Sequence, residues 1–198
     1  MIFHYHYWTP NLEETEQFYT QLGFTVRQRI GKKDRTFQSY NPPLTWDDFR
    51  KETPLFRIIE MKKGQVNVTI GFGKKVMFDH IGFLVTKDQH DTVCKKAREL
   101  GWKPDEAERR TFIPTPYGFR LELQTHSDVL DTGEPAIEEI RLGVLKAGLE
   151  KDLVYLFGRN LSVKTELEEI PSLKEVKLSN IASGTDPNGV LISGTALG

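Results

Sequence analysis

Histidines are the residues whose type and spacing first point to chemistry in this chain. His4 and His6 lie two residues apart in the opening segment FHYHYW, and His80 lies in a second aromatic segment, FDHIGFLV. Imidazole binds divalent metals and exchanges protons near neutral pH. A histidine in a strand is more often a structural residue than a ligand. Two interpretations of these histidines therefore stay open: they are metal ligands, or they are polar residues within an aromatic strand.

The elements around the histidines follow one repeated order. Each histidine segment has the aromatic composition of a strand, and each is followed by a helical pattern that ends in Leu-Gly and an aromatic residue. Pro10 and three early glutamates favour the start of the first helix. The order βαβββ is predicted twice, with strands at 2–8, 24–30, 55–61, 65–72, 78–85 and 110–124 (two strands around a Pro-Tyr-Gly turn), a weak strand at 103–108, and helices at 9–23 and 87–101.

A fainter third copy follows a predicted linker at 127–135. It contains a strand at 136–144, a helix at 147–158 and two strands at 174–181 and 188–194. Repeats of this kind are a strong organising signal. We expect one domain over residues 1–126, made of modules 1–75 and 76–126, and a degenerate third module or C-terminal extension over 127–198.

Alternation of side chains along the strands separates two faces. The apolar sets, which we expect to pack on the helices, are Phe3, Tyr5 and Tyr7; Ile81 and Phe83; and Leu121 and Leu123. The sets expected on the opposite face are His4, His6 and Trp8; His80 and Gly82; and Arg120, Glu122 and Gln124. Polar groups on that face are costly if the sheet encloses them, unless a metal or hydrogen bonds satisfy them.

Three segments together resemble the vicinal oxygen chelate superfamily, which includes glyoxalase I, fosfomycin and bleomycin resistance proteins and extradiol dioxygenases. They are HYHYWTPNLEETEQFYTQLGF, HIGFLVTKDQHDTVCKKARELGW and the closing TPYGFRLELQ. The resemblance covers residues 2–126. It implies an α+β fold in which paired βαβββ modules form a cupped half-barrel, here followed by a degenerate third βαβββ-like module. It also implies a metal in the cup, with ligands from the first and last strand of each module.

The residues at the implied ligand positions are His4, His80 and Glu122, and Glu122 is also the expected catalytic carboxylate. The fourth position falls in the strand whose inward residues are predicted as Gln65, Asn67 and Thr69, none of which is the carboxylate that glyoxalase I has. Two histidines and one glutamate leave coordination positions open. We therefore expect a divalent metal (Fe, Mn, Ni or Zn) and substrate-binding roles for His6, Trp8, Asn67 and Arg120.

The resemblance leaves the reaction open. Extradiol ring cleavage needs a histidine and a tyrosine shortly before the Pro-x-Gly-x-x-x-Glu ending, where this chain has EAERRTFIPTPYG with Tyr117 inside the turn. Phosphonate binding needs cations, for which Arg57 and Arg120 are candidates. Isomerase chemistry is disfavoured because Glu122 is the only carboxylate predicted on that face. The third copy has Glu139 and Ser193 where His80 and Glu122 stand in the second.

An insertion at 33–53 carries three large apolar residues, which are Tyr40, Trp46 and Phe49. They could form a lid over the cup, form a subunit contact, or pack on the sheet. His90 is expected at a helix surface and receives no role, and neither does His126.

Composition narrows the class of partner. The 27 basic and 28 acidic residues nearly balance, so we expect neither a nucleic-acid nor a membrane surface, and Cys94 reads as a small core residue. No segment has the pattern of a membrane helix or a signal peptide, so a cytoplasmic protein is expected. The odd third module favours a homodimer. The leading hypothesis is a metalloenzyme acting on a small oxygen-bearing molecule; the alternatives are a metal-free binding protein of bleomycin-resistance type and a structural module.

Overall fold

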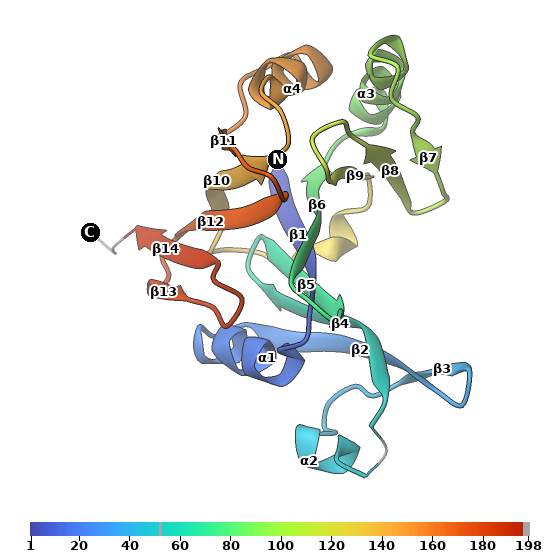
Figure 1. The fold of residues 1–198 in the computed structure, drawn as a ribbon, viewed down its shortest axis with the longest axis vertical. Coiled ribbons are helices and arrows are strands. Elements are labelled where there is room, and N and C mark those ends of the chain that lie inside the picture. The colour runs from blue at the N-terminus through green and yellow to red at the C-terminus, as the bar shows by residue number, and fades with distance from the viewer. Residues whose placement is uncertain (52, 196–198) are drawn as a thin grey trace.

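The structure is a computed structural model that describes residues 1–51 and 53–195 (Figure 1). The first βαβββ unit contains β1 (Ile2–Thr9), α1 (Leu12–Gln21), β2 (Thr25–Lys33), β3 (Thr36–Ser39), α2 (Trp46–Phe49), β4 (Leu55–Lys63) and β5 (Val66–Phe72). The second contains β6 (Met77–Leu84), α3 (Lys87–Glu99), β7 (Asp105–Glu106), β8 (Arg110–Pro114) and β9 (Arg120–Gln124). After a short 3-10 helix, η1 (Ser127–Val129), the last unit contains β10 (Ile137–Val144), α4 (Leu149–Phe157), β11 (Val163–Leu167), β12 (Ser172–Ser179), β13 (Gly184–Thr185) and β14 (Leu191–Thr195).

The first two units share one curved sheet, which we call sheet A. Its strand order is β3-β2-β4-β5-β1-β6-β9-β8-β7. The two opening strands, β1 and β6, lie antiparallel at its centre, and each pairs in parallel with the closing strand of its own unit, β5 or β9. This pairing places the histidine segments side by side and puts β9 directly next to β6.

Local signals define the helices that flank this sheet. Thr86 and Gln89 form a capping box at the start of α3, in which each side chain bonds the other residue's backbone N–H. Gly101 follows α3 in the left-handed region, at φ 78°, as the predicted Leu-Gly ending requires. Within the described residues, no helix is long and apolar enough to cross a membrane.

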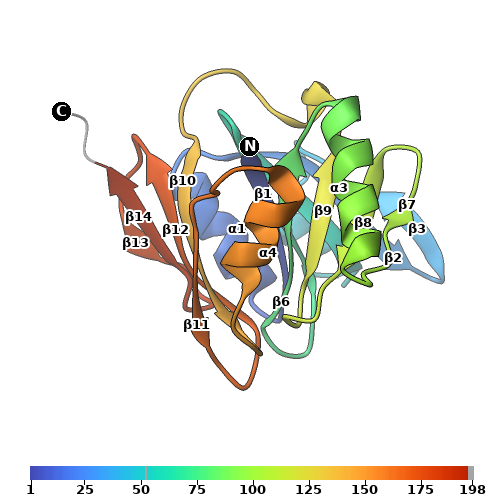
Figure 2. The same cartoon turned by 90° about the horizontal axis from the view of Figure 1, so that it is seen from above.

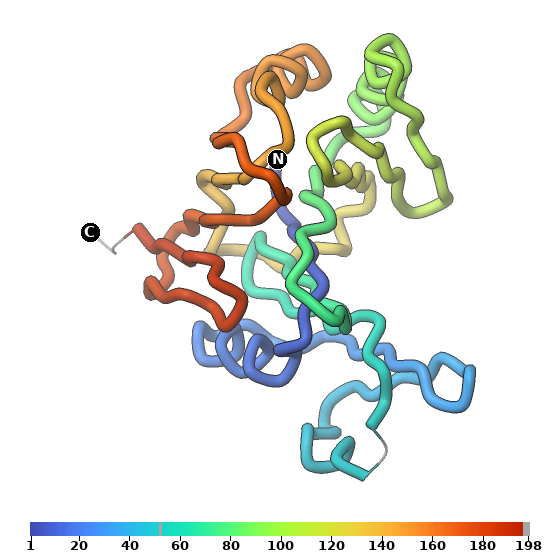
Figure 3. The backbone as a smooth tube through the Cα atoms, viewed as in Figure 1, coloured from blue at the N-terminus to red at the C-terminus, as the bar shows by residue number. Residues whose placement is uncertain are grey.

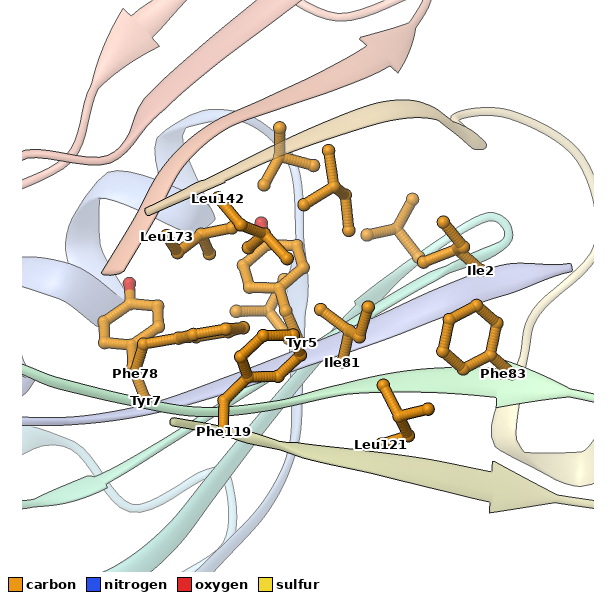
Figure 4. Packing of buried hydrophobic residues seen from close by; sticks show 14 of the residues in the cluster. Ile2, Tyr5, Tyr7, Phe78, Ile81, Phe83, Phe119, Leu121, Leu142 and Leu173 are labelled. Carbon is orange, nitrogen blue, oxygen red and sulfur yellow. The ribbon is translucent and has the colours of Figure 1, made fainter. Parts of the chain in front are cut away.

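The last unit forms sheet B, whose strand order is β11-β10-β12-β14-β13. Its apolar face packs on the helix side of sheet A, so that Leu142 and Leu173 meet Tyr5, Phe78 and Ile81 in one buried core (Figure 4). Seen from above, α4 lies beside α3 and sheet B lies beside α1 (Figure 2), and the tube in Figure 3 shows the same arrangement. The last unit therefore covers the helix side of sheet A and leaves the opposite face, which carries the histidines, uncovered.

Sheet B repeats the pairing of five consecutive strands of sheet A, from β5 to β8 in the sheet order. Strands β11, β10, β12, β14 and β13 pair as β5, β1, β6, β9 and β8 do, with the same alternation of parallel and antiparallel neighbours. By register, Glu139, Glu175 and Ser193 take the places of His4, His80 and Glu122. The Glu139 carboxylate pairs with Lys164, and Ser193 donates to Glu175 at 2.6 Å. The polar face of sheet B is thus internally paired.

The insertion packs on the sheet. The rings of Tyr40, Trp46 and Phe49 all contact Phe56 on β4, with centroids 5.2–5.7 Å apart. Arg29 ties the same segment down through the carbonyl oxygens of Tyr40 and Leu44. The structure therefore shows the packing on the sheet that was one of the three roles left open by the sequence.

Candidate metal centre

His4, His80 and Glu122 converge on the uncovered face of sheet A, although they come from three different strands. The Nε2 atoms of His4 and His80 lie 3.0 Å apart. Glu122 Oε2 lies 3.0 Å from His80 Nε2 and 3.6 Å from His4 Nε2. All three residues are buried, and β1, β6 and β9 are adjacent strands. The sheet pairing therefore brings together the three residues that the sequence predicted.

Each imidazole is held by its other nitrogen. His4 Nδ1 donates to the carbonyl oxygen of Asn67 at 2.9 Å, and His80 Nδ1 donates to Asp79 Oδ2 at 2.7 Å. These acceptors fix the proton on Nδ1, so the lone pair of each Nε2 points into the cluster. A hydrogen bond to a carbonyl or carboxylate is the usual support of a metal-binding histidine.

Gly82 makes room for the cluster. It pairs across the sheet with His4 on one side and Glu122 on the other. A Cβ atom at this position would lie 2.7 Å from His4 Cβ and 3.1 Å from His4 Cδ2. Any larger residue would therefore displace the His4 ring from its present place.

The protonation states of the cluster suit a ligand set. Burial lowers the pKa of His4 to about 4, with the charge of Glu122 opposing the shift. Burial tends to raise the pKa of Glu122, but the contact with His80 and the charges of both histidines bring it down to about 2. At neutral pH His4 is neutral and Glu122 is ionised, which are the forms that bind metals.

The distances also suit a divalent ion. Two ligand bonds of about 2.1 Å at right angles place their donor atoms about 3.0 Å apart. The separations of 3.0 Å between His4 and His80 and between His80 and Glu122 match two edges of one face of such an octahedron, and the 3.6 Å between His4 and Glu122 is wider than a right angle gives. Two histidines and one carboxylate on one face leave the other positions open to water or substrate, as in non-haem iron oxygenases. The residues present therefore fit a divalent metal such as Fe or Mn.

Two cavities flank the cluster, and the predicted substrate-binding residues divide between them. His6, Trp8 and Arg120 line a cavity of about 290 Å³ that also touches His80. Asn67 lines a second cavity of about 260 Å³ with His4, Glu122 and Gln124. Gln28, Glu60, Thr69 and Arg110 border both.

His6 lies next to the cluster without joining it. Its Nδ1 is 2.7 Å from Thr69 Oγ1, its ring stacks on His80 at a centroid distance of 5.1 Å, and burial lowers its pKa well below the usual value. His6 Nε2 and Asn67 Oδ1 are buried and have no hydrogen-bond partner among the described residues. Both side chains thus hold unused polar atoms at the edge of the cup.

The structure adds residues that the sequence did not point to. Asp79 bridges His80 and Arg120, and these contacts overcome the effect of burial and lower the pKa of its carboxyl far below the usual range. Glu60 on β4 accepts a hydrogen bond from Asn67 Nδ2 at 2.7 Å. The expectation that Glu122 is the only carboxylate on this face is therefore wrong. The sequence could have indicated Asp79, because it is the neighbour of His80. The place of Glu60 beside the cup depends on the pairing of β4 with β5 and could not be predicted.

Aromatic and cationic groups form the wall of the larger cavity. Arg57 lies over the Trp8 ring at 4.4 Å from its centroid, and Arg120 lies over Phe112 at 4.2 Å. Phe112 also contacts the His80 ring edge-on at 5.0 Å. Neither Arg110 nor Phe112 was a candidate from sequence, because β8 carries no polar pattern that distinguishes its two faces.

Several other expectations differ from the structure. Phe3 lines the smaller cavity and Ile2 joins the core, because the β1–β6 register shifts between Ile2 and His4. Gln65 precedes β5 and donates to the carbonyl oxygen of Gly133, away from the cup. Tyr117 is buried and donates to Asp152 in α4. His90, expected at a helix surface, is only 8 % exposed.

Comparison with known proteins identifies the fold. No protein-family model matches the sequence, and neither does any curated protein. The 2,3-dioxygenase LapB from Pseudomonas sp. KL28 matches with a TM-score of 0.63 and 12% identity over 98% of this chain and 92% of its own. Homoprotocatechuate 2,3-dioxygenase from Arthrobacter globiformis matches with a TM-score of 0.61 and 11% identity over 98% of this chain and 79% of its own. A variant of 4-hydroxymandelate synthase from Streptomyces coelicolor matches with a TM-score of 0.61 and 10% identity over 90% of this chain and 70% of its own.

These matched proteins have the vicinal oxygen chelate fold, and at identities of 10–12% the likeness concerns the fold alone. The predicted fold is confirmed: this chain has the curved, paired sheets of vicinal oxygen chelate proteins.

Proposed function

We propose that this protein, built on the vicinal oxygen chelate fold, is a metal-dependent enzyme that acts on a small molecule with two adjacent oxygen atoms. His4, His80 and Glu122 are the proposed ligands of one divalent metal. The observation that carries the proposal is the convergence of two imidazole lone pairs and one carboxylate within 3.6 Å. Each imidazole ring is oriented by a hydrogen bond from its Nδ1 atom, to the carbonyl oxygen of Asn67 or to Asp79. Such an arrangement is repulsive unless a cation or a proton occupies its centre.

Dioxygenase-type chemistry is the reaction class that we propose first. The names of two matched structures describe 2,3-dioxygenases, and the ligand set is the one that leaves room for both a chelating substrate and dioxygen. A divalent metal bound here would polarise the substrate oxygens and, as Fe(II), bring dioxygen to them. The metal identity and the substrate follow from experiment.

The residues of the larger cavity would position the substrate. Trp8 and Phe112 offer flat apolar walls, and Arg57 and Arg120 place positive charge above them. His6 lines the same cavity and carries a buried Nε2 that has no hydrogen-bond partner among the described residues. We assign these side chains the roles of holding a planar, oxygen-bearing molecule against the metal and keeping bulk water out.

A metal-free binding protein is the weaker proposal. Tyr5 and Tyr7 lie in the core on the other face of sheet A, as their place in the strand predicted, so they offer no aromatic contact to a molecule in the cup. The aromatic wall at Trp8 is the observation that still supports a metal-free binding function. A binder without metal would also leave the buried His4–His80–Glu122 cluster without a purpose.

The test uses catechol as a chelating probe. Protein loaded anaerobically with Fe(II) should show a new absorption change on adding catechol, and no such change should occur in His80→Ala protein treated in the same way. Admission of air should then cause oxygen uptake in the wild type alone. Catechol binding that is equal in metal-free and metal-loaded protein would favour the binding function, and absence of any binding would refute a chelating substrate of this type.

A further inference from the structure

A second group of metal-binding side chains lies outside the cup, between α3 and the β7–β8 hairpin. His90 and Cys94 are four residues apart on α3, so both face the hairpin, and Glu106 lies on β7. One ligand atom from each residue lies within 4.8 Å of the other two. These atoms are a nitrogen, a sulfur and a carboxylate oxygen, none of which takes part in the cup.

The separation of the two helix ligands suits a tetrahedral ion. His90 Nε2 lies 3.7 Å from Cys94 Sγ. Zinc bonds of about 2.0 Å to nitrogen and about 2.3 Å to sulfur, at a tetrahedral angle, place these two atoms about 3.5 Å apart. The side chains therefore need almost no movement to share one ion.

His90 is oriented as a ligand would be. Its Nδ1 donates to Asp91 Oδ1 at 2.9 Å, which leaves Nε2 as the nitrogen with the lone pair. The Thr111 hydroxyl lies 2.8 Å from Nε2 and donates to it. A metal ion would replace the neutral contacts of Nε2 with the Thr111 hydroxyl and the Cys94 thiol, and the threonine hydroxyl can turn toward a metal-bound water.

The third ligand is accessible and can be released. His90 and Cys94 are buried, whereas Glu106 is exposed and a cavity of about 200 Å³ lies along His90 and Glu106. Glu106 pairs with Arg98 at the surface, and exposed ion pairs of this kind contribute little to stability. The cavity gives an ion a path to the buried nitrogen of His90, beside which the Cys94 sulfur lies.

We propose that His90, Cys94 and Glu106 form a zinc site, with Nε2, Sγ and a carboxylate oxygen as ligands and water in the fourth position. A mixed nitrogen, sulfur and oxygen set favours Zn²⁺ over Mg²⁺, Ca²⁺ and Mn²⁺, which prefer oxygen. The site ties α3 to the β7–β8 hairpin. Because Thr111 alternates along β8 with Arg110 and Phe112, which line the cup, an ion here also steadies one wall of the larger cavity.

Cobalt(II) is the probe, because a cobalt–thiolate bond gives a charge-transfer absorption that nitrogen and oxygen ligands do not. Cys94 is the only cysteine of the chain, so this absorption in the wild type can come from no other residue. We expect it to disappear when Zn²⁺ is added. His80→Ala protein, in which the cup lacks one ligand, should keep it in full and should saturate at one cobalt per chain, which separates this site from the cup and leaves the outcome independent of the proposed function.

Matched variants assign the ligands. His90→Gln and Cys94→Ser should abolish the absorption, and Asp91→Asn should keep it while weakening apparent cobalt affinity about 10- to 100-fold, as loss of a supporting carboxylate does. His126→Gln, a change at an exposed histidine, should alter nothing. Circular dichroism checks that each variant is folded. A wild-type protein that gives no thiolate absorption at saturating cobalt, or a folded His90→Gln protein that keeps it unchanged, would overturn the proposal.

Discussion

The Nε2 atoms of His4 and His80 lie 3.0 Å apart although 76 residues separate them along the chain. Both Nδ1 atoms already donate to acceptors behind the rings, so the two facing nitrogens present lone pairs to each other and to the Glu122 carboxylate. A buried arrangement of this kind is stable when a cation sits between the groups.

Asp79→Ala should weaken metal binding without removing it. Asp79 accepts from His80 Nδ1 and also holds Arg120, so its loss frees the His80 ring to turn. Loss of such a supporting carboxylate costs about 10- to 100-fold in metal affinity. Competition with a coloured chelator measures the change. Asp131→Ala is the matched control, because Asp131 pairs with Arg27 at the surface and should leave the affinity within about twofold of wild type.

Gly82→Ala should damage the metal site more than the fold. The added Cβ would lie 2.7 Å from His4 Cβ, so His4 must move away from His80 and Glu122. We expect metal affinity to fall on the order of 10-fold or more, with a far-ultraviolet circular dichroism spectrum like that of the wild type. An unchanged affinity in the folded variant would show that His4 need not occupy its present position.

Glu16→Ala should destabilise the chain strongly. Glu16 accepts from Arg29 Nε and Nη2 at 2.8 and 2.6 Å, and both side chains are buried, so the change leaves an unpaired buried guanidinium. Removal of one partner of a buried pair costs about 3–5 kcal/mol in the free energy of unfolding, which urea denaturation measures. Glu13→Ala breaks the exposed pair with Arg50 and should cost about 0–1 kcal/mol. Equal effects of the two variants would contradict this account of the insertion.

Stability should fall above about pH 10. Burial raises the pKa of Tyr5, Tyr7 and Tyr19 well above 10 in the folded chain, and Tyr7 also donates to the buried Asp186 at 2.5 Å. The unfolded chain loses these protons near pH 10 while the folded chain keeps them. The unfolded state then binds fewer protons, so the free energy of unfolding decreases as the pH rises beyond that point.

Urea midpoints at pH 8 and pH 11, with tyrosinate absorbance recorded at the same time, measure this effect. Absorbance of Tyr5, Tyr7 and Tyr19 should appear together with unfolding. Tyr155 is a surface tyrosine whose pKa is raised by its hydrogen bond to Glu99, so Tyr155→Phe should weaken the pH dependence less than Tyr19→Phe, which removes a fully buried hydroxyl. Full ionisation of all tyrosines in a chain that is still folded would contradict the prediction.

Much of the cup was predictable because local patterns decide it. Alternation along β1, β6 and β9 separated the polar from the apolar face, and the Leu-Gly endings located both helices. The alternation and the helix endings depend on near neighbours in the chain, which a single sequence records. His4, His80 and Glu122 were instead implied by the resemblance to the vicinal oxygen chelate superfamily, whose ligands lie in the first and last strand of each module.

Features that depend on pairing between distant strands were not predictable. Glu60 reaches the cup through the register of β4 with β5, and Phe3 changes face through an irregularity in the β1–β6 register. Strand β11 was not anticipated, and only the folded chain shows that it pairs in parallel with β10. His90 is buried because Thr111 on β8 packs against α3, which its helical pattern alone does not reveal.

Binding of Mn(II) tests the central claim most directly, because this oxygen-preferring ion favours the cup over the thiolate site. Electron paramagnetic resonance of the free ion, recorded during titration of metal-free protein, counts the Mn(II) that each chain takes up. The account predicts one Mn(II) per chain in the wild type and in Cys94→Ser, and none at the same concentrations in His80→Ala or Glu122→Ala. Wild-type protein that takes up no Mn(II) or Fe(II), or folded His80→Ala protein that takes up as much as the wild type, would contradict it.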